Sequence, residues 1–152
     1  MTDHEGMLMA LAEAQKAYEA GETPVGAVLV REGKIVARAH NLQETLHDPT
    51  AHAEMQCLRL AAQEKGDWRL PDSTLYVTLE PCPMCAGAMV MSRLGRVVYG
   101  ASDPEKGCCG SIYDLPNDPA LHSRTRWTAD ILAKDCESLL TAIFQERRHT
   151  HS

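Results

Sequence analysis

Two short stretches of the chain carry residues that could perform chemistry together: His52 with Glu54, and Cys82 with Cys85. One imidazole and two thiolates are ligands that zinc prefers, and three protein ligands leave the fourth tetrahedral position for water. Zinc lowers the pKa of such a water to about 7, so that hydroxide forms at neutral pH. Glu54 is placed to take the proton of the water and pass it to a departing amine. We therefore predict a catalytic zinc site with His52, Cys82 and Cys85 as ligands and Glu54 as the proton carrier.

Simpler interpretations of the Cys-x-x-Cys motif are a redox pair, half of a structural zinc site, or two buried thiols. A structural zinc is usually closed by four Cys or His ligands, and no second Cys-x-x-Cys or His-x-x-x-His motif is present. Cys108 and Cys109 are adjacent rather than spaced. A non-catalytic zinc module that binds RNA would have no use for Glu54. The four residues together therefore favour hydrolytic deamination.

Longer stretches of the chain carry a resemblance to a known family. The His-x-Glu and Pro-Cys-x-x-Cys motifs mark zinc deaminases in general. The chain resembles the bacterial tRNA-specific adenosine deaminases, within the cytidine and deoxycytidylate deaminase superfamily, from about Leu8 to Arg148. The resemblance is carried by 22–28, 47–54, 75–82, 84–89 and 95–100.

The resemblance implies a three-layer α/β/α fold of the cytidine deaminase type, with a five-stranded mixed sheet and one zinc ion per subunit. It also implies a homodimer whose partner contributes to each substrate pocket. The implied reaction converts the wobble adenosine of a tRNA anticodon loop to inosine and releases ammonia. An anticodon loop suits such an enzyme because a base in a loop is flipped out at little cost.

The resemblance also implies residues that bind the substrate. It assigns Asn41 to the base, the backbone of Ala53 and Glu80 to positioning substrate and water, and an RNA-contacting surface to Lys106, Phe144, Arg147 and Arg148. A turn residue after a strand is the simpler interpretation of Asn41, and a core position that of Phe144. The chain departs from the usual family pattern at His122-Ser123-Arg124, Cys108-Cys109 and Asp114, so the loop contacts of these residues can differ.

Composition is that of an ordinary globular chain. The 152 residues are 44% hydrophobic and 24% charged, which fits one domain over 1–152 with only the last few residues disordered. No apolar run reaches the roughly 20 residues that cross a bilayer, and no secretory leader is recognisable. With two of six cysteines in a metal site and the rest scattered, a reducing, cytoplasmic location is expected.

The net charge of −6 opposes indiscriminate binding of polyanions. The main rival function is therefore a deaminase of the same fold that acts on a free base or nucleoside, of guanine or cytosine type. The Arg147-Arg148 pair and the nearly full-length resemblance oppose that rival. Basic residues also gather after the metal motif, where one face could be positive: Arg93, Arg96, Lys106, Arg124, Arg126, Arg147 and Arg148.

Hydrophobic periodicity predicts the elements that must position these residues. We expect helices over 7–20, 53–64, 82–92 and 130–148, and strands over 25–30, 34–39, 74–79, 96–99 and 124–128. This order predicts a mixed sheet covered by helices on both faces, with ligands entering at the carboxyl ends of the strands. His52 and Cys82 then both lie at the start of a helix.

Overall fold

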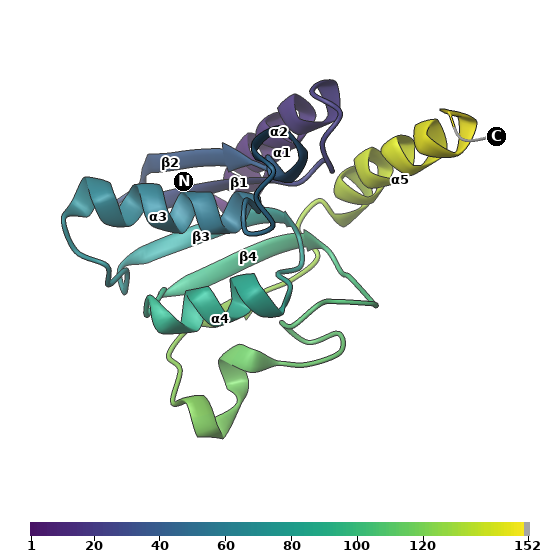
Figure 1. The fold of residues 1–152 in the computed structure, drawn as a ribbon. Helices are drawn as coiled ribbons and strands as arrows, with labels where there is room; N and C mark the ends of the chain where they lie inside the picture. The colour runs from purple at the N-terminus through teal and green to yellow at the C-terminus, as the bar shows by residue number, and fades with distance from the viewer. Residues whose placement is uncertain (151–152) are drawn as a thin grey trace.

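The computed structural model describes residues 1–150, with side chains described for all of these except Phe144 and 146–150. Its centre is a five-stranded sheet in the order β2-β1-β3-β4-β5 (Figure 1). β1 is antiparallel to both of its neighbours, whereas β3, β4 and β5 are parallel. The predicted mixed sheet is thereby confirmed. The strands are β1 Gly26–Arg31, β2 Lys34–His40, β3 Ser73–Leu79, β4 Arg96–Ala101 and β5 Arg126–Thr128.

Helices cover both faces of the sheet and form the outer layers of the predicted α/β/α arrangement (Figure 1). α1 and α5 pack on one face, and α3 and α4 on the other. The helices are α1 Asp3–Glu19, α2 Gln43–Leu46, α3 Ala53–Lys65, α4 Pro83–Met91 and α5 Ala133–Thr150, with 3₁₀ turns η1 Leu115–Asn117 and η2 Pro119–Leu121. Within the described residues, none of these helices has the length and apolar character needed to cross a membrane.

Several observed boundaries differ from the expected ones: β5 begins at residue 126 and not at 124, β4 ends at residue 101 and not at 99, and two helices also differ. α1 begins four residues early because the Thr2 side chain accepts a hydrogen bond from the Glu5 amide and caps the helix. α5 begins late because Asp130 and Leu132 have positive φ angles, which a helix does not accept. α5 also continues two residues beyond the expected end at Arg148. The four-residue α2 was not predicted, since one turn carries no periodicity.

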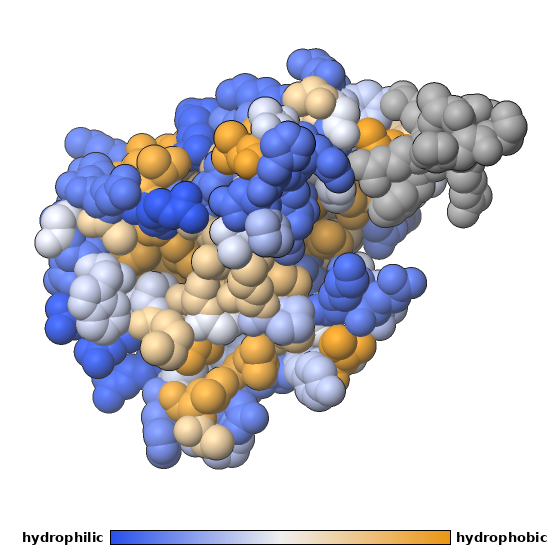
Figure 2. Space-filling view, viewed as in Figure 1, coloured by the Kyte–Doolittle hydropathy of each residue, from blue (hydrophilic) through white to orange (hydrophobic). Residues whose placement is uncertain are grey.

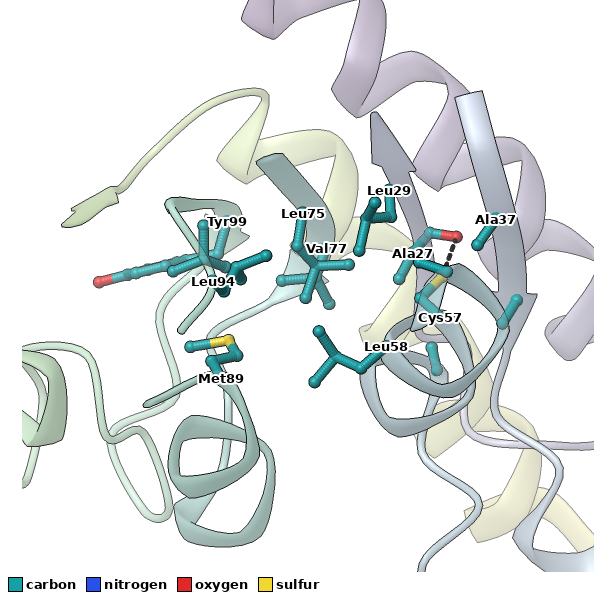
Figure 3. Close-up of a cluster of buried hydrophobic side chains, with 14 of the residues drawn as sticks. Ala27, Leu29, Ala37, Cys57, Leu58, Leu75, Val77, Met89, Leu94 and Tyr99 are labelled. Atoms are coloured by element: carbon teal, nitrogen blue, oxygen red, sulfur yellow. Dashed lines mark hydrogen bonds between the residues drawn. The ribbon is translucent and has the colours of Figure 1, made fainter. Parts of the chain in front are cut away.

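Alternate residues of β1 face the two helical layers. Ala27 and Leu29 belong to the cluster under α3 and α4, whereas Val28 and Val30 pack with α1 and α5. Figure 3 shows the first cluster, in which the Cys57 thiol donates to the Ala27 carbonyl. A strand buried on both faces reads as a continuous apolar run, which explains why this strand does not alternate in sequence.

Gly26 lets α1 approach the sheet closely. A Cβ atom at Gly26 would overlap the backbone of Ala10 and Ala14 in α1. Glycine is therefore required where the helix crosses the start of β1, which leads directly into the pocket described below.

The two helices of the other layer begin at the same edge of the sheet. His52 stands directly before the first residue of α3 and Cys82 directly before that of α4, so both lie at the start of a helix, as predicted. β3 ends at Leu79 three residues before Cys82, and Pro83 opens α4, where its missing N–H is not needed. The order of elements therefore brings the two halves of the zinc motif together.

Candidate active site

The predicted ligand side chains converge between the N-termini of α3 and α4. His52 Nδ1 lies 3.5 Å from Cys82 Sγ and 3.4 Å from Cys85 Sγ, and the three ligand atoms all lie within 4.8 Å of one another. Tetrahedral zinc, with bonds of about 2.0 to 2.3 Å, sets such nitrogen and sulfur atoms roughly 3.5 Å apart. The group therefore fits a zinc ion, and it is the only such cluster found among the described residues.

Hydrogen bonds within this cluster set its protonation. The Cys85 thiol donates to Cys82, and this bond, with the His52 contact, lowers the pKa of Cys82 to about 4. The bond to Cys82 also raises the pKa of His52 above its usual value, and the pKa of Cys85 rises because its proton is held between the two sulfurs. Zinc ligation needs both thiols deprotonated, so metal binding is coupled to the release of protons.

Glu54 lies in the first turn of α3, two residues after the ligand His52, and its side chain is nearly buried. Burial raises the pKa of its carboxyl to about 7. A carboxyl with a pKa near neutral can both take and give a proton at physiological pH, as a general acid and base must. Glu54 is not a member of the ligand group, so its carboxyl is available for this work.

A pocket of about 710 Å³ opens beside the ligand group. Its size falls within the range of roughly 300 to 1,000 Å³ that is usual for sites of small organic ligands. The walls come from the segment before β1, the stretch from the end of β2 to the start of α3, the end of β3 with the start of α4, the loop after β4, and α5. The lining residues are Thr23, Val25, Asn41, Gln43, His52, Glu54, Leu79, Glu80, Cys82, Ser102, Asp103, Pro104, Glu105, Lys106 and Leu140.

Asn41 is buried at the wall of this pocket with its amide group held in one orientation. Its Oδ1 accepts from the Ala53 backbone N–H at 3.2 Å, and its Nδ2 donates to Gln43 Oε1 at 3.3 Å. Ala53 itself does not line the pocket, and its amide is already used by Asn41. The amide of Ala53 therefore orients the residue that we expect to meet the base.

The other predicted substrate residues divide into two groups. Glu80 and Lys106 line the pocket, Glu80 buried and Lys106 exposed at the rim. The side chains of Phe144, Arg147 and Arg148 lie outside the described residues, as do 151–152, where the expected disorder of the last residues falls.

Nine of the lining residues were not among the predicted site residues, and three of them show which signals the sequence did and did not carry. Gln43 lies two residues after Asn41, and Asp103 follows β4 at the sheet edge where ligands were expected. Both could have been found from their position. Leu140 reaches the pocket from α5, and an ordinary apolar helix residue carries no signal for such a role.

At two of the departures from the family pattern, the side chains make their contacts within the protein. Asp114 accepts from the Trp127 indole at 3.0 Å and from the Asn117 amide at 2.8 Å. Cys108 and Cys109 are buried free thiols whose pKa values are raised by burial. The two neighbouring thiols form no disulfide with each other.

Comparison with known proteins agrees with this site. Residues 1–101 match the zinc-binding region of cytidine and deoxycytidylate deaminases. The fold and the ligand group are those of a zinc-dependent deaminase, and the chain belongs to the cytidine and deoxycytidylate deaminase family. Its branch is that of the tRNA-specific adenosine deaminases: the chain is 49% identical over 142 residues to the protein of this name from Bacillus subtilis, covering 93% of this chain and 88% of that protein.

Among solved structures, too, the similarity to a tRNA deaminase is higher than the similarity to a guanine deaminase. A structure from work on tRNA:A34 deaminases and A-to-I editing at the wobble position of transfer RNA has a TM-score of 0.86 and 40% identity, and the match covers 89% of this chain and 98% of that one. Guanine deaminase from Bacillus subtilis has a TM-score of 0.66 and 32% identity, covering 98% and 95%. The predicted fold and family are therefore confirmed.

Proposed function

We propose that this protein deaminates the wobble adenosine of a tRNA anticodon loop to inosine and releases ammonia. The observation that carries the proposal is the ligand group His52, Cys82 and Cys85 with Glu54 beside it, all at one pocket. The tRNA substrate is supported by 49% identity to a tRNA-specific adenosine deaminase over nearly the whole of both chains.

Side chains around the pocket have separate tasks in this reaction. His52, Cys82 and Cys85 would hold the zinc ion, which would supply a hydroxide nucleophile at neutral pH. Glu54 takes one proton from the water and gives it to the adenine ring nitrogen beside the attacked carbon, and it then moves the second water proton, from the hydroxyl now on that carbon, to the amino group, so that the C–N bond breaks and ammonia leaves. Asn41, held by Ala53 and Gln43, donates to or accepts from the base edge and keeps it in register with Glu54.

A free base is the rival substrate, and two observations weigh against it. Identity to guanine deaminase is 32%, against 49% to the tRNA-specific enzyme. The pocket also has an open rim that carries an exposed lysine, Lys106, where a flanking phosphate of an RNA loop would lie. A loop nucleotide reaches such a pocket with its neighbours still attached.

We also infer that two copies of the chain associate through the layer formed by α3 and α4. Met91 is 74% exposed and Trp68 is 51% exposed on this side, and Figure 2 shows apolar side chains gathered between and over the two helices. Apolar surface of this kind commonly marks an interface. The shallow groove there is lined by Met55, Leu58, Arg59, Ala62, Trp68, Ala88, Met91 and Ser92.

Sedimentation of the zinc-loaded chain tests this homodimer. Wild type is expected to sediment as a dimer at micromolar concentration, and Met91→Asp as a monomer, because a charge in an apolar interface is costly. Leu8→Asp, which alters an equally apolar residue 48% exposed on α1, should stay dimeric. A monomeric wild type would refute the inference.

We also propose that the protein is located in the cytoplasm. All six cysteines are free thiols, as a reducing compartment maintains them.

Assay of the purified zinc protein tests the reaction. Two transcripts of one tRNA are compared, with adenosine or guanosine at the wobble position, alongside free guanine, adenine, adenosine and cytidine. We expect one inosine per transcript, at the wobble position only, for the transcript with adenosine there, none for the transcript with guanosine, and no turnover of the free compounds. Turnover of guanine without reaction on the tRNA would replace this proposal by the guanine deaminase alternative.

A further inference from the structure

The Glu80 carboxylate has a dense set of hydrogen bonds that the proposed reaction does not use. The side chain is 2% exposed. Its Oε1 accepts from the Asp103 amide at 3.0 Å and from the Ser111 hydroxyl, and its Oε2 accepts from the amides of Cys109 and Ser111 at 3.0 and 3.1 Å. Three backbone donors and one hydroxyl thus converge on one buried acid.

These donors all belong to the segment 102–111, which follows β4 and forms one wall of the pocket. The segment contains no helix and only an isolated bridge at Cys109. Its amides therefore have few partners of the regular kind, and buried amides need one. Glu80 supplies that partner at three positions, and except for Ser102 the residues of the segment that face the pocket lie within the stretch that these bonds span.

The same segment is tied to the backbone that carries a zinc ligand. The Glu80 amide donates to the Ala101 carbonyl at 2.8 Å, and the Cys108 amide donates to the Pro81 carbonyl at 2.9 Å. Cys82 follows Pro81 directly. One short stretch, 80–82, therefore holds a zinc ligand at one end and the pocket wall at the other.

Gly107 lets the segment 102–111 lie close to the Glu80 carboxylate. A Cβ atom at this position would overlap the Glu80 carboxylate and the Asp103 carbonyl. The wall can lie against the carboxylate only because residue 107 has no side chain. No cationic side chain is hydrogen-bonded to Glu80 in the described residues, so these donors alone offset the cost of burying it.

We propose that the Glu80 carboxylate is a positioning residue that holds the wall 102–106 at a set place relative to Cys82, and thereby keeps a substrate-binding surface preorganised beside the zinc site. A wall that is ordered before the substrate arrives binds it without a further loss of conformational freedom, so loss of the anchor weakens binding more than it slows the chemical step. Contact between the wall and an RNA strand rests on the proposed function, whereas the anchoring of the wall by the carboxylate does not depend on it.

Glu80→Gln tests the proposal with almost no change in shape. Whichever way the amide is turned, its NH₂ group faces at least one backbone N–H that now donates to the acid. We expect hydrogen exchange at Asp103, Cys109 or Ser111 to rise about tenfold or more, because the local bonds are lost. KM for tRNA should rise about tenfold with kcat reduced by less than about threefold, and zinc should stay near one per chain.

Gly107→Ala reaches the same bonds from the opposite side and should give the same exchange pattern and the same rise in KM. Glu13→Gln is the control, because Glu13 is also a buried carboxylate, 3% exposed, but pairs with Lys16 away from the pocket. It should leave the exchange of segment 102–111 and the tRNA kinetics as in wild type. If both test variants fail to load zinc, Ser111→Ala, which removes the hydroxyl alone, carries the same comparison with a smaller effect.

Unchanged exchange in segment 102–111 would overturn the anchoring role. Faster exchange with unchanged KM would overturn the positioning role. A wild type that deaminates guanine and not tRNA would refute the proposed function instead, and the same two measurements made with guanine would still decide the role of Glu80.

Discussion

Hydrogen-bond partners decide what each buried glutamate of this protein does. Burial raises the pKa of Glu54, which stands at the pocket beside the ligand group. Burial acts on Glu22 in the same direction, but bonds from the backbone and hydroxyl of Thr45, both at 2.7 Å, and from the Glu44 amide outweigh it and lower the pKa. Glu22 therefore stays ionised and holds α2, whereas Glu54 can move a proton.

Glu54→Gln should keep about one zinc per chain and lose deamination by roughly 10²- to 10⁴-fold or more, because the amide cannot carry the proton. Metal analysis and single-turnover kinetics on tRNA measure the two effects. Glu19→Gln, an exposed position at the end of α1, is the control with full activity. Loss of zinc from Glu54→Gln would make this residue a ligand and not the proton carrier.

Cys82→Ser should lower the zinc content and the melting temperature together, since metal binding and local folding are linked. The matched comparison is Cys108→Ala with Cys109→Ala, two buried thiols outside the ligand group. That double variant should keep zinc, although it loses some packing. Mass spectrometry measures the zinc content of Cys82→Ser and of the double variant. A metal-free double variant would contradict the ligand assignment.

At the scale of elements, one acid ties α1 to the centre of the sheet. Asp3, in the first turn of α1, accepts from the Arg96 guanidinium at 2.8 and 2.7 Å and from the Tyr76 hydroxyl at 3.0 Å. The Arg96 bonds hold the pKa of Asp3 below its ordinary value. Arg96 begins β4 and Tyr76 lies in β3, so this contact fixes the start of the helix against two neighbouring strands.

Asp3→Asn should lower the free energy of unfolding by about 1 kcal/mol at pH 7, a value reduced because the pair is partly solvated. The folded-state pKa is depressed, so this stabilisation is present above the unfolded pKa of about 3.9 and is lost as pH falls through the folded value. Urea unfolding should therefore show a constant difference between wild type and variant from pH 8 to 5 and a shrinking one below pH 4.

The control for this prediction is Asp72→Asn. Asp72 pairs with Lys65 at 3.6 Å and its side chain is 54% exposed, so the change should cost less than about 0.5 kcal/mol at any pH. An equal loss for both variants would mean that the contacts of Asp3 with Arg96 and Tyr76 contribute no more than an ordinary surface pair.

At the scale of the whole molecule, the position of the basic residues matters more for RNA binding by an acidic protein than their number. The net charge is −6, and α5 itself has as many acidic as basic residues, but it runs on from the pocket, where Leu140 is one of the lining residues, to the adjacent pair Arg147 and Arg148. Continuity of α5 between Leu140 and its last residues links the pocket to Arg147 and Arg148 along one element.

Arg147→Ala with Arg148→Ala should weaken binding of full-length tRNA and reduce the slope of log affinity against log salt by roughly one to two units, as expected for lost phosphate contacts. KM should rise far more than kcat falls. A salt series on wild type and the double variant measures both, with melting temperature as the folding control. Identical slopes would remove these arginines from the RNA surface and return weight to a free-base substrate.

The sequence by itself determined the chemistry and most of the frame. Residue types and short spacings pointed to His52, Cys82 and Cys85 as a group that could hold zinc, which the structure brings together, and to Glu54 as the proposed proton carrier. The strands of the sheet could be predicted because β1, β3 and β4 are short runs rich in β-branched residues bounded by turn residues. These signals are local, and each is complete within about ten residues.

Only the tertiary structure decided which distant residues complete the site. Asn41 is oriented by Ala53, Leu140 reaches the pocket from α5, and the Glu80 carboxylate binds amides more than twenty residues away. The groove over α3 and α4 likewise exists only once the two helices lie side by side. Such contacts are set by strand order and helix packing, so they leave no pattern in the residues on either side of them.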